Sequence, residues 1–369
     1  MTFLEDLKSL AILFRWLGPW ADEEQAPPSL REDLFIPNGN EPDLKIWVYK
    51  PTRGPIRGAY LIGPGLHFKG AQHPKLDRFA RILARGGNLV FSPFISDYEN
   101  LQIRPETYAP FKRAFQALKN HPEVPRNTKP GLFSISFGCW LTLQLASDPD
   151  IAHDVGACLV FGGYGDFEEA VHFATTGKLF GEKAIHFDPL GLPVVFLQFV
   201  DAVQNQPPNN APLIAAWKEY VYQTWDQGDE MKKYGKNIPI AHNLLKKLPL
   251  DCQELFLIGC GLHENSEQIV IETLERFDSS HFELRPRFRH IQCPTFIFHG
   301  TDDDVIPYTQ AQILTDALPS HIHKETYLTG LYGHSTQEKR SFWTLAKDLS
   351  KELKTMVKML DLLNRGGRF

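Results

Sequence analysis

Short apolar runs that favour β-strands alternate with amphipathic segments through the first half of this chain of 369 residues. The runs predict strands over 44–49, 57–62, 88–94, 131–135 and 156–161. The amphipathic segments predict helices over about 75–85, 106–119 and 138–147. Parallel strands need crossover connections, which are usually helices, so the alternation predicts an α/β fold with a mostly parallel central sheet flanked by helices.

The same alternation returns near the end of the sequence, after a long interruption. It predicts a strand over 294–299, a helix over 308–317, a strand over 324–328 and a final helix over about 336–363. The interruption predicts helices over 194–204, 211–225 and 265–276, separated by turns that contain proline and glycine. We therefore predict a core formed by 31–165 and 291–369, with 166–290 inserted as a helical cap over the sheet edge.

Residues 1–30 are predicted to hold a separate amphipathic helix, because apolar side chains recur at helical spacing over 3–17. Its apolar face is expected to dock on the rest of the chain or on a second copy in a homodimer, with weak contact to a membrane surface as the alternative. Acidic neighbours offset Lys8 and Arg15, which weakens attraction to anionic lipid. The segment lacks the features of a secretory signal or a membrane span, so we expect a cytoplasmic protein.

Charge and cysteine content exclude several classes of partner and cofactor. The chain has 39 Lys and Arg against 44 Asp and Glu, a net charge of −5, and no long basic run, so nucleic acid is not an expected partner. Its five cysteines include no Cys-x-x-Cys pair, which favours buried free thiols over disulfides or a structural zinc site. There is no His-Glu-x-x-His motif, and neither a metal nor an organic cofactor is expected.

The strongest chemical signal is a serine at a predicted junction between a strand and a helix. The apolar strand that begins at Gly131 runs into Ser134-Ile-Ser136-Phe-Gly138, and a helical pattern follows at once. A nucleophile elbow has this arrangement, because small residues two positions before and after the serine allow a tight turn that projects its hydroxyl beyond the sheet. Ser134 stands where glycine is usual. A serine that only caps the start of a helix is the alternative.

A serine nucleophile needs a base and an acid, and the later predicted strands supply both types of residue. The strand over 294–299 ends in a turn with three consecutive aspartates, 302 to 304, although such a turn can also be merely solvated. The last predicted strand is followed by Gly333-His334. His334 is singled out among the fourteen histidines by the chain order Ser, Asp, His.

A glycine-rich loop follows the strand over 57–62. Its sequence is Gly63-Pro-Gly-Leu66-His-Phe-Lys-Gly70. Glycines let backbone N–H groups approach a developing oxyanion closely, although a plain glycine-rich turn would have the same composition.

Together these four elements resemble the α/β-hydrolase family over about 32–363, a resemblance that implies a site residue by residue. It implies Ser136 as the nucleophile, His334 as the base, and Asp303, four positions into a Gly-x-x-Asp-x-x-hydrophobic-Pro turn, as the acid. Asp302 and Asp304 remain alternatives as the acid. The backbone amides of Leu66 and Phe137 are implied as oxyanion donors. The chain departs from the family at Ser134, in place of glycine, and at Pro64, in place of histidine.

The resemblance implies acyl transfer by a serine hydrolase. Large apolar and aromatic residues in 194–225 favour esters with apolar acyl or aromatic groups as small-molecule substrates. An acyltransferase or a peptidase could use the same residues. A catalytically silent hydrolase-like binding protein is the alternative from another class.

Overall fold

The computed structural model describes residues 26–38, 41–179, 182–183, 187–225, 227, 231, 235–330 and 342–367, together with 11 and 15. The helix predicted over 3–17, and with it the expected docking face, therefore lies outside the described residues apart from two positions. Among the described residues, no helix combines the length and the apolar character that crossing a bilayer requires.

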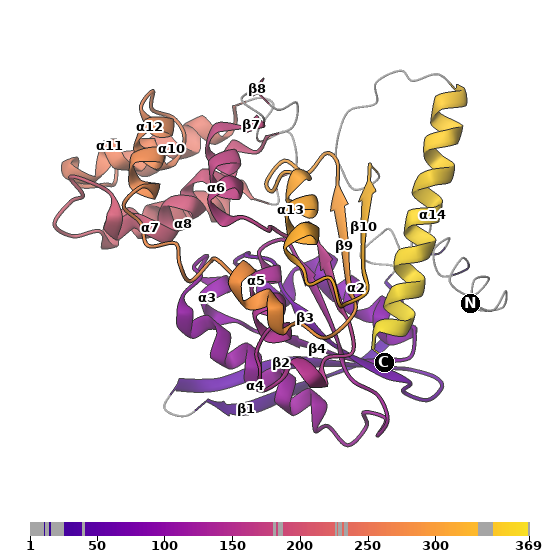
Figure 1. Cartoon of the computed structure of the whole chain (residues 1–369). Helices are drawn as coiled ribbons and strands as arrows, with labels where there is room; N and C mark the ends of the chain where they lie inside the picture. Colours follow the sequence, from indigo (N-terminus) through magenta and orange to yellow (C-terminus); the bar gives the residue numbers. More distant parts are fainter. Residues whose placement is uncertain are drawn as a thin grey trace.

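An eight-stranded sheet forms the centre of the molecule, in the order β1-β2-β4-β3-β5-β6-β9-β10 (Figure 1). Its strands are β1 (Ser29–Asn38), β2 (Glu41–Pro51), β3 (Gly58–Gly63), β4 (Asn88–Pro93), β5 (Gly131–Ile135), β6 (Cys158–Phe161), β9 (Thr295–Gly300) and β10 (Lys324–Thr329). β2 runs antiparallel to β1 and β4, and the other neighbouring strands are parallel. This arrangement confirms the predicted mostly parallel α/β sheet.

The strand of the central sheet that sequence analysis missed is β1, at the sheet's edge; the short strands β7 (Lys178–Leu179) and β8 (Glu182–Lys183), which pair within the segment predicted as helical, were also missed. β1 pairs only with β2, and Leu30 and Phe35 are 58% and 57% exposed. Only Leu34 and Ile36 of this edge strand pack, partly buried, against the core, and exposed Phe35 lies between them. The alternation of apolar and polar residues is therefore too weak to identify the strand.

Helices cover both faces of the sheet, and successive residues of a strand point into different apolar clusters. In β4, Phe91 belongs to the apolar cluster that includes residues of α4 (Tyr108–Lys119), α5 (Gly138–Ala146) and α13 (Thr309–Ala317), whereas Val90 belongs to the cluster that includes residues of α2 (Pro74–Arg85) and α14 (Phe342–Gly366). This two-sided burial explains why the inner parallel strands, from β4 to β9 in the sheet order, are largely apolar runs.

A block of helices lies between β6 and β9 in sequence and to one side of the sheet in space (Figure 1). We call it the helical insertion; it contains α6 (Phe167–Thr176), α7 (Leu192–Phe199), α8 (Ala211–Thr224), α10 (Asn237–Leu245), α11 (Leu250–Gly259), α12 (Ser266–Leu274) and η7 (Arg285–His290). Its interior is built on large buried rings. Trp217 is fully buried and donates its ring N–H to the carbonyl oxygen of Phe256 at 3.2 Å.

Candidate active site

Ser136 occupies a strained position between β5 and α5. Its φ is +52°, and only two other described non-glycine residues, Leu101 and Asn205, also have positive φ. Residues other than glycine rarely adopt this backbone conformation, and where they do, the strain is often associated with function. The Ser136 N–H donates to the carbonyl oxygen of Phe161 at 2.8 Å, which holds the turn against β6.

The other small residues of the turn have distinct packing roles. A Cβ atom on Gly138 would lie 2.4 Å from the Gly63 carbonyl oxygen and 2.5 Å from that of Pro64, so only glycine fits there. Ser134 is fully buried, and the Thr142 hydroxyl donates to its oxygen at 2.9 Å. Its hydroxyl is therefore satisfied inside the fold, which explains how the chain accommodates serine at a position where glycine is usual.

A buried tyrosine also supports the turn. The Tyr98 hydroxyl, from the short helix α3 (Ser96–Glu99), donates to the carbonyl oxygen of Phe137 at 2.9 Å. Burial raises the pKa of Tyr98 well above its ordinary value, so the hydroxyl keeps its proton and remains a donor. Sequence analysis did not identify this residue, because its partner is 39 positions away.

The loop after β3 brings a second backbone segment close to the serine. A Cβ atom on Gly65 would lie 3.8 Å from the Ser136 Cβ, and Leu66 and Phe137 line the same cavity as Ser136. Within the described part of the chain, the N–H groups of Leu66 and Phe137 donate to no protein acceptor. Two backbone donors on the residue after the serine and on the loop after β3 are the arrangement of an oxyanion hole.

Asp303 lies in the turn after β9, two strands from β5 at the same edge of the sheet. Its Oδ1 accepts hydrogen bonds from the N–H groups of Val305 at 3.0 Å and Ile306 at 2.9 Å. Its Oδ2 lies 3.1 Å from where a Cβ on Gly162 would be, so a glycine after β6 leaves space for it. Asp304, one of the alternative acids, lines the cavity.

The structure thus places Ser136, Leu66, Phe137 and Asp303 along one sheet edge. His334 lies outside the described residues, so the predicted base is not positioned relative to the serine or the acid. The nearest potential competitor as nucleophile is Cys139, whose thiol is fully buried. Burial raises the pKa of Cys139 to about 12, which keeps it protonated and unreactive.

A cavity of about 370 Å³ opens beside Ser136. Residues from the core form one wall, and the helical insertion forms the other with mainly apolar side chains: Phe167, Val171, Ala174, Leu190, Val194, Val195, Phe199 and Trp225. Asp188, Gln198 and Thr224 are the polar residues of that second wall. A second cavity, of about 590 Å³, borders Ser136 on the side of α2. These volumes lie in the range of small-molecule sites.

Aromatic residues at the end of α8 contact the loop after β3 directly. The rings of Trp225 and His67 have centroids 5.3 Å apart, and those of Tyr222 and Phe68 are 4.8 Å apart. Sequence analysis noted the aromatic residues of this segment without assigning them a partner. Their contacts tie the helical insertion to the loop that carries Leu66. Within the described part of the chain, no group of three or more metal-ligating side chains occurs.

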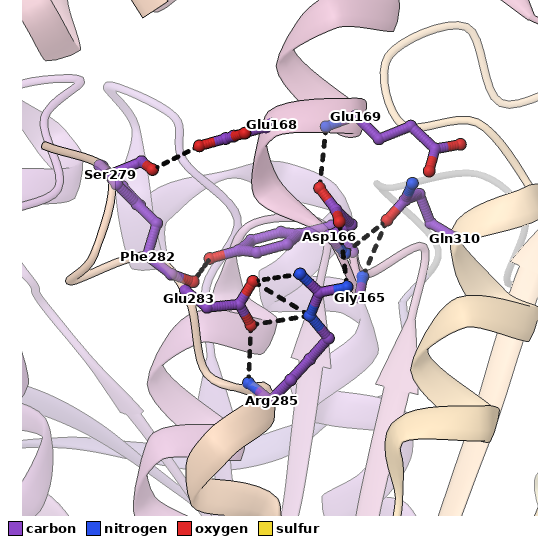
Figure 2. A network of polar contacts seen from close by, with 10 residues as sticks. Gly165, Asp166, Glu168, Glu169, Ser279, Phe282, Glu283, Arg285 and Gln310 are labelled. Atoms are coloured by element: carbon purple, nitrogen blue, oxygen red, sulfur yellow. Dashed lines mark hydrogen bonds and ion pairs between the residues drawn. The ribbon is translucent and has the colours of Figure 1, made fainter. Parts of the chain in front are cut away.

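Figure 2 shows a polar network where the chain enters and leaves the helical insertion. Asp166 is the N-cap of α6: its side chain accepts a hydrogen bond from the Glu169 N–H at 3.0 Å. It also forms an ion pair with Arg285 at 3.0 Å. Arg285 in turn pairs with Glu283. Gln310, at the start of α13 in the core, accepts the N–H groups of Gly165 and Asp166 at 3.0 and 2.8 Å. Gln310 therefore joins the core to the segment that enters the insertion, and the Asp166–Arg285 pair joins that segment to the one that leaves it.

We expect Gln310→Leu to lower the free energy of unfolding by about 2–4 kcal/mol, because it leaves the buried N–H of Gly165 and the partly buried N–H of Asp166 without an acceptor. Denaturant titration measures this loss. The matched control is Gln312→Leu on the same helix, whose side chain is exposed and bonds only Asp316, and which should change stability by under about 0.5 kcal/mol. Equal losses for the two variants would contradict the prediction.

Comparison with known proteins gives similarity in structure only. No protein-family model matches the chain, and no curated protein is significantly similar in sequence. A 2,6-dihydroxy-pseudo-oxynicotine hydrolase is 14% identical with a TM-score of 0.48, over 98% of this chain and 78% of that one. Acylaminoacyl peptidase of Pyrococcus horikoshii is 10% identical with a TM-score of 0.45, over 94% of this chain and 43% of that one. Dienelactone hydrolase of Anabaena variabilis is 12% identical with a TM-score of 0.43, over 88% of this chain and 96% of that one.

At these identities the substrates of those proteins say nothing about this chain, and the assignment depends on its own structure. Ser136 is held at positive φ between a central parallel strand and a buried helix, which is the backbone geometry of a nucleophile elbow, and the loop after β3 lies close to it. The resemblance inferred from sequence is therefore confirmed at the level of the fold: this chain has the α/β-hydrolase fold, with a mostly parallel eight-stranded sheet flanked by helices.

Proposed function

We propose that this protein is a serine hydrolase that cleaves carboxylic esters with apolar acyl or aromatic groups. The observation that carries the proposal is Ser136, held at φ +52° beside a cavity with two backbone N–H groups that lack a protein acceptor in the described chain. An energetically costly conformation that presents a hydroxyl to an apolar cavity is what a nucleophile needs and a capping serine does not.

The proposed mechanism proceeds through an acyl-enzyme. His334 takes the proton from the Ser136 hydroxyl, and the serine oxygen attacks the ester carbonyl carbon. The N–H groups of Leu66 and Phe137 stabilise the oxyanion, each contributing roughly 3–4 kcal/mol to the transition state. Asp303 orients the imidazole. The intermediate collapses as His334 returns the proton to the departing alcohol, and water then releases the acid by the same steps.

We also propose that residues 166–290 act as a cap that selects the substrate. Support comes from the apolar wall that the helical insertion contributes to the cavity beside Ser136. Apolar surface favours binding of apolar groups, at about 25 cal/mol per Å² removed from water. The predicted partner is thus a small apolar ester.

A panel of p-nitrophenyl esters with acyl chains of two to sixteen carbons tests the proposed function. We expect turnover of short and medium esters. Peptide anilides and alcohol acceptors, added in separate arms, test the peptidase and acyltransferase alternatives, which a cleaved anilide or a transferred acyl group would favour. A well-folded protein that turns over no ester would overturn the proposal and favour the silent binding protein.

The cavity wall predicts how chain length is selected. Val195 lines the cavity from α7, so Val195→Trp should lower kcat/KM for the longest accepted ester by roughly tenfold or more. For the acetate ester, kcat/KM should stay within about threefold of the parent value. Steady-state kinetics on the ester panel measures the change. Ile238→Trp, on α10 and away from the cavity, is the control. A uniform loss across all chain lengths would argue against Val195 as part of the acyl site.

A further inference from the structure

His299 is a fully buried histidine that the proposed mechanism does not use. It lies in β9, one residue before Gly300, and is 0% exposed. Its Nε2 lies 2.9 Å from the carbonyl oxygen of Ile306 and 3.4 Å from Oδ2 of Asp303. A carbonyl oxygen only accepts, so Nε2 carries the hydrogen and donates. Nδ1 is buried with no partner in the described chain.

The side chains of His299 and Asp303 both hydrogen-bond to the backbone of the same turn, at Val305 and Ile306. Asp303 Oδ1 accepts the N–H groups of Val305 and Ile306, while His299 Nε2 donates to the Ile306 carbonyl. The peptide groups on both sides of Ile306 are therefore held by side chains. Oδ1 is occupied by two backbone donors, so Oδ2 is the oxygen that remains for a catalytic histidine, and it is the one closest to His299.

His299 is not itself suited to be the base. It lines neither of the cavities that border Ser136. Its single donated hydrogen is committed to the turn. Its position instead suits a side chain that determines where the carboxylate of Asp303 lies.

We propose that His299 is a positioning residue that fixes Oδ2 of Asp303 for the catalytic histidine. The inference rests on the proposed function, because it concerns the acid of that site. Displacement of a catalytic group by about 1 Å can cost on the order of a hundredfold in rate. Loss of the Nε2–H bond should therefore lower kcat and leave substrate binding nearly intact.

The test compares His299→Leu with His299→Gln, whose side-chain amide places a donor near the position of Nε2. We expect His299→Leu to lower kcat by roughly tenfold to a hundredfold with KM within about twofold, and His299→Gln to recover most of that loss. His299→Asn, with a shorter donor, serves if the leucine variant does not fold. Phe298→Leu is the matched control, because it truncates the adjacent core residue on the opposite face of β9 and should leave kcat unchanged.

A double-mutant cycle with Asp303→Asn separates positioning from a general structural effect. If His299 acts through Asp303, His299→Leu causes no further loss in the Asp303→Asn background. Two results would overturn the inference while leaving the proposed function intact. One is an equal reduction of kcat by His299→Leu in both backgrounds, and the other is a folded His299→Leu protein with the parent kcat. If Asp303→Asn alone has parent activity, the acid assignment fails, and the role of His299 fails with it.

Discussion

Ser136→Ala is expected to reduce ester turnover by roughly a million-fold and to abolish covalent labelling by a fluorophosphonate probe. The variant removes the only atom that can form the acyl-enzyme, while the backbone donors of Leu66 and Phe137 stay in place. Alanine has no large effect on packing here, because the Ser136 side chain borders a cavity. The variant should therefore still fold, and any structural change should be confined to the turn that holds residue 136.

The matched control is Ser134→Ala, which removes a hydroxyl two residues away that is fully buried and bonded to Thr142. We expect this variant to lose about 1 kcal/mol of stability but to keep labelling and turnover within a few-fold of the parent. Mass spectrometry of the labelled peptide distinguishes the two serines. Labelling that persists in Ser136→Ala at the parent rate would refute the assignment of the nucleophile.

Gly138→Ala is expected to cost at least about 3 kcal/mol in the free energy of unfolding and to inactivate whatever protein remains folded. The added methyl group would lie 2.4 and 2.5 Å from two backbone carbonyl oxygens, those of Gly63 and Pro64. Backbone atoms cannot move aside as a flexible side chain can. The loop after β3 must therefore shift away from the elbow, and the N–H of Leu66 moves with it.

Denaturant unfolding and the ester assay measure the two effects separately. Gly191→Ala is the control for stability, since a methyl group there meets no atom within 4 Å and φ at that position is −76°. It should change the free energy of unfolding by less than about 1 kcal/mol. A Gly138→Ala protein as stable and active as the parent would mean that the loop and the elbow do not need their close approach.

The fold was predictable because burial on two faces produces a local sequence pattern. The inner parallel strands are short apolar runs, and helices such as α2 have an apolar stripe, so both can be recognised without knowledge of their neighbours. β1 lacked such a signal because it is an exposed edge strand. The elbow was predictable for the same local reason, since the strand, the small residues and the helix are adjacent in sequence.

The supporting contacts of the site were not predictable from sequence. Tyr98 contacts Phe137 across 39 positions, Gln310 contacts Gly165 across 145, and Trp225 in the insertion contacts His67 in the loop after β3. Such pairings depend on the three-dimensional path of the chain, and no periodicity encodes them. His299 was equally hidden, because a single histidine in an apolar strand gives no sign of what its ring nitrogens bond.

The two ends of the helical insertion meet each other, and this bears on how such a protein can change over evolution. The Phe167 and Phe282 rings stack at 3.9 Å, and the Tyr164 hydroxyl donates to the Phe282 carbonyl at 3.1 Å. With its ends held together, doubling the length of the intervening chain costs only about 0.6 kcal/mol in closure entropy. Helices can therefore be gained, lost or exchanged between these two points while the turn at Ser136 stays the same, so under the proposed function new substrates can be acquired without a change in the catalytic residues.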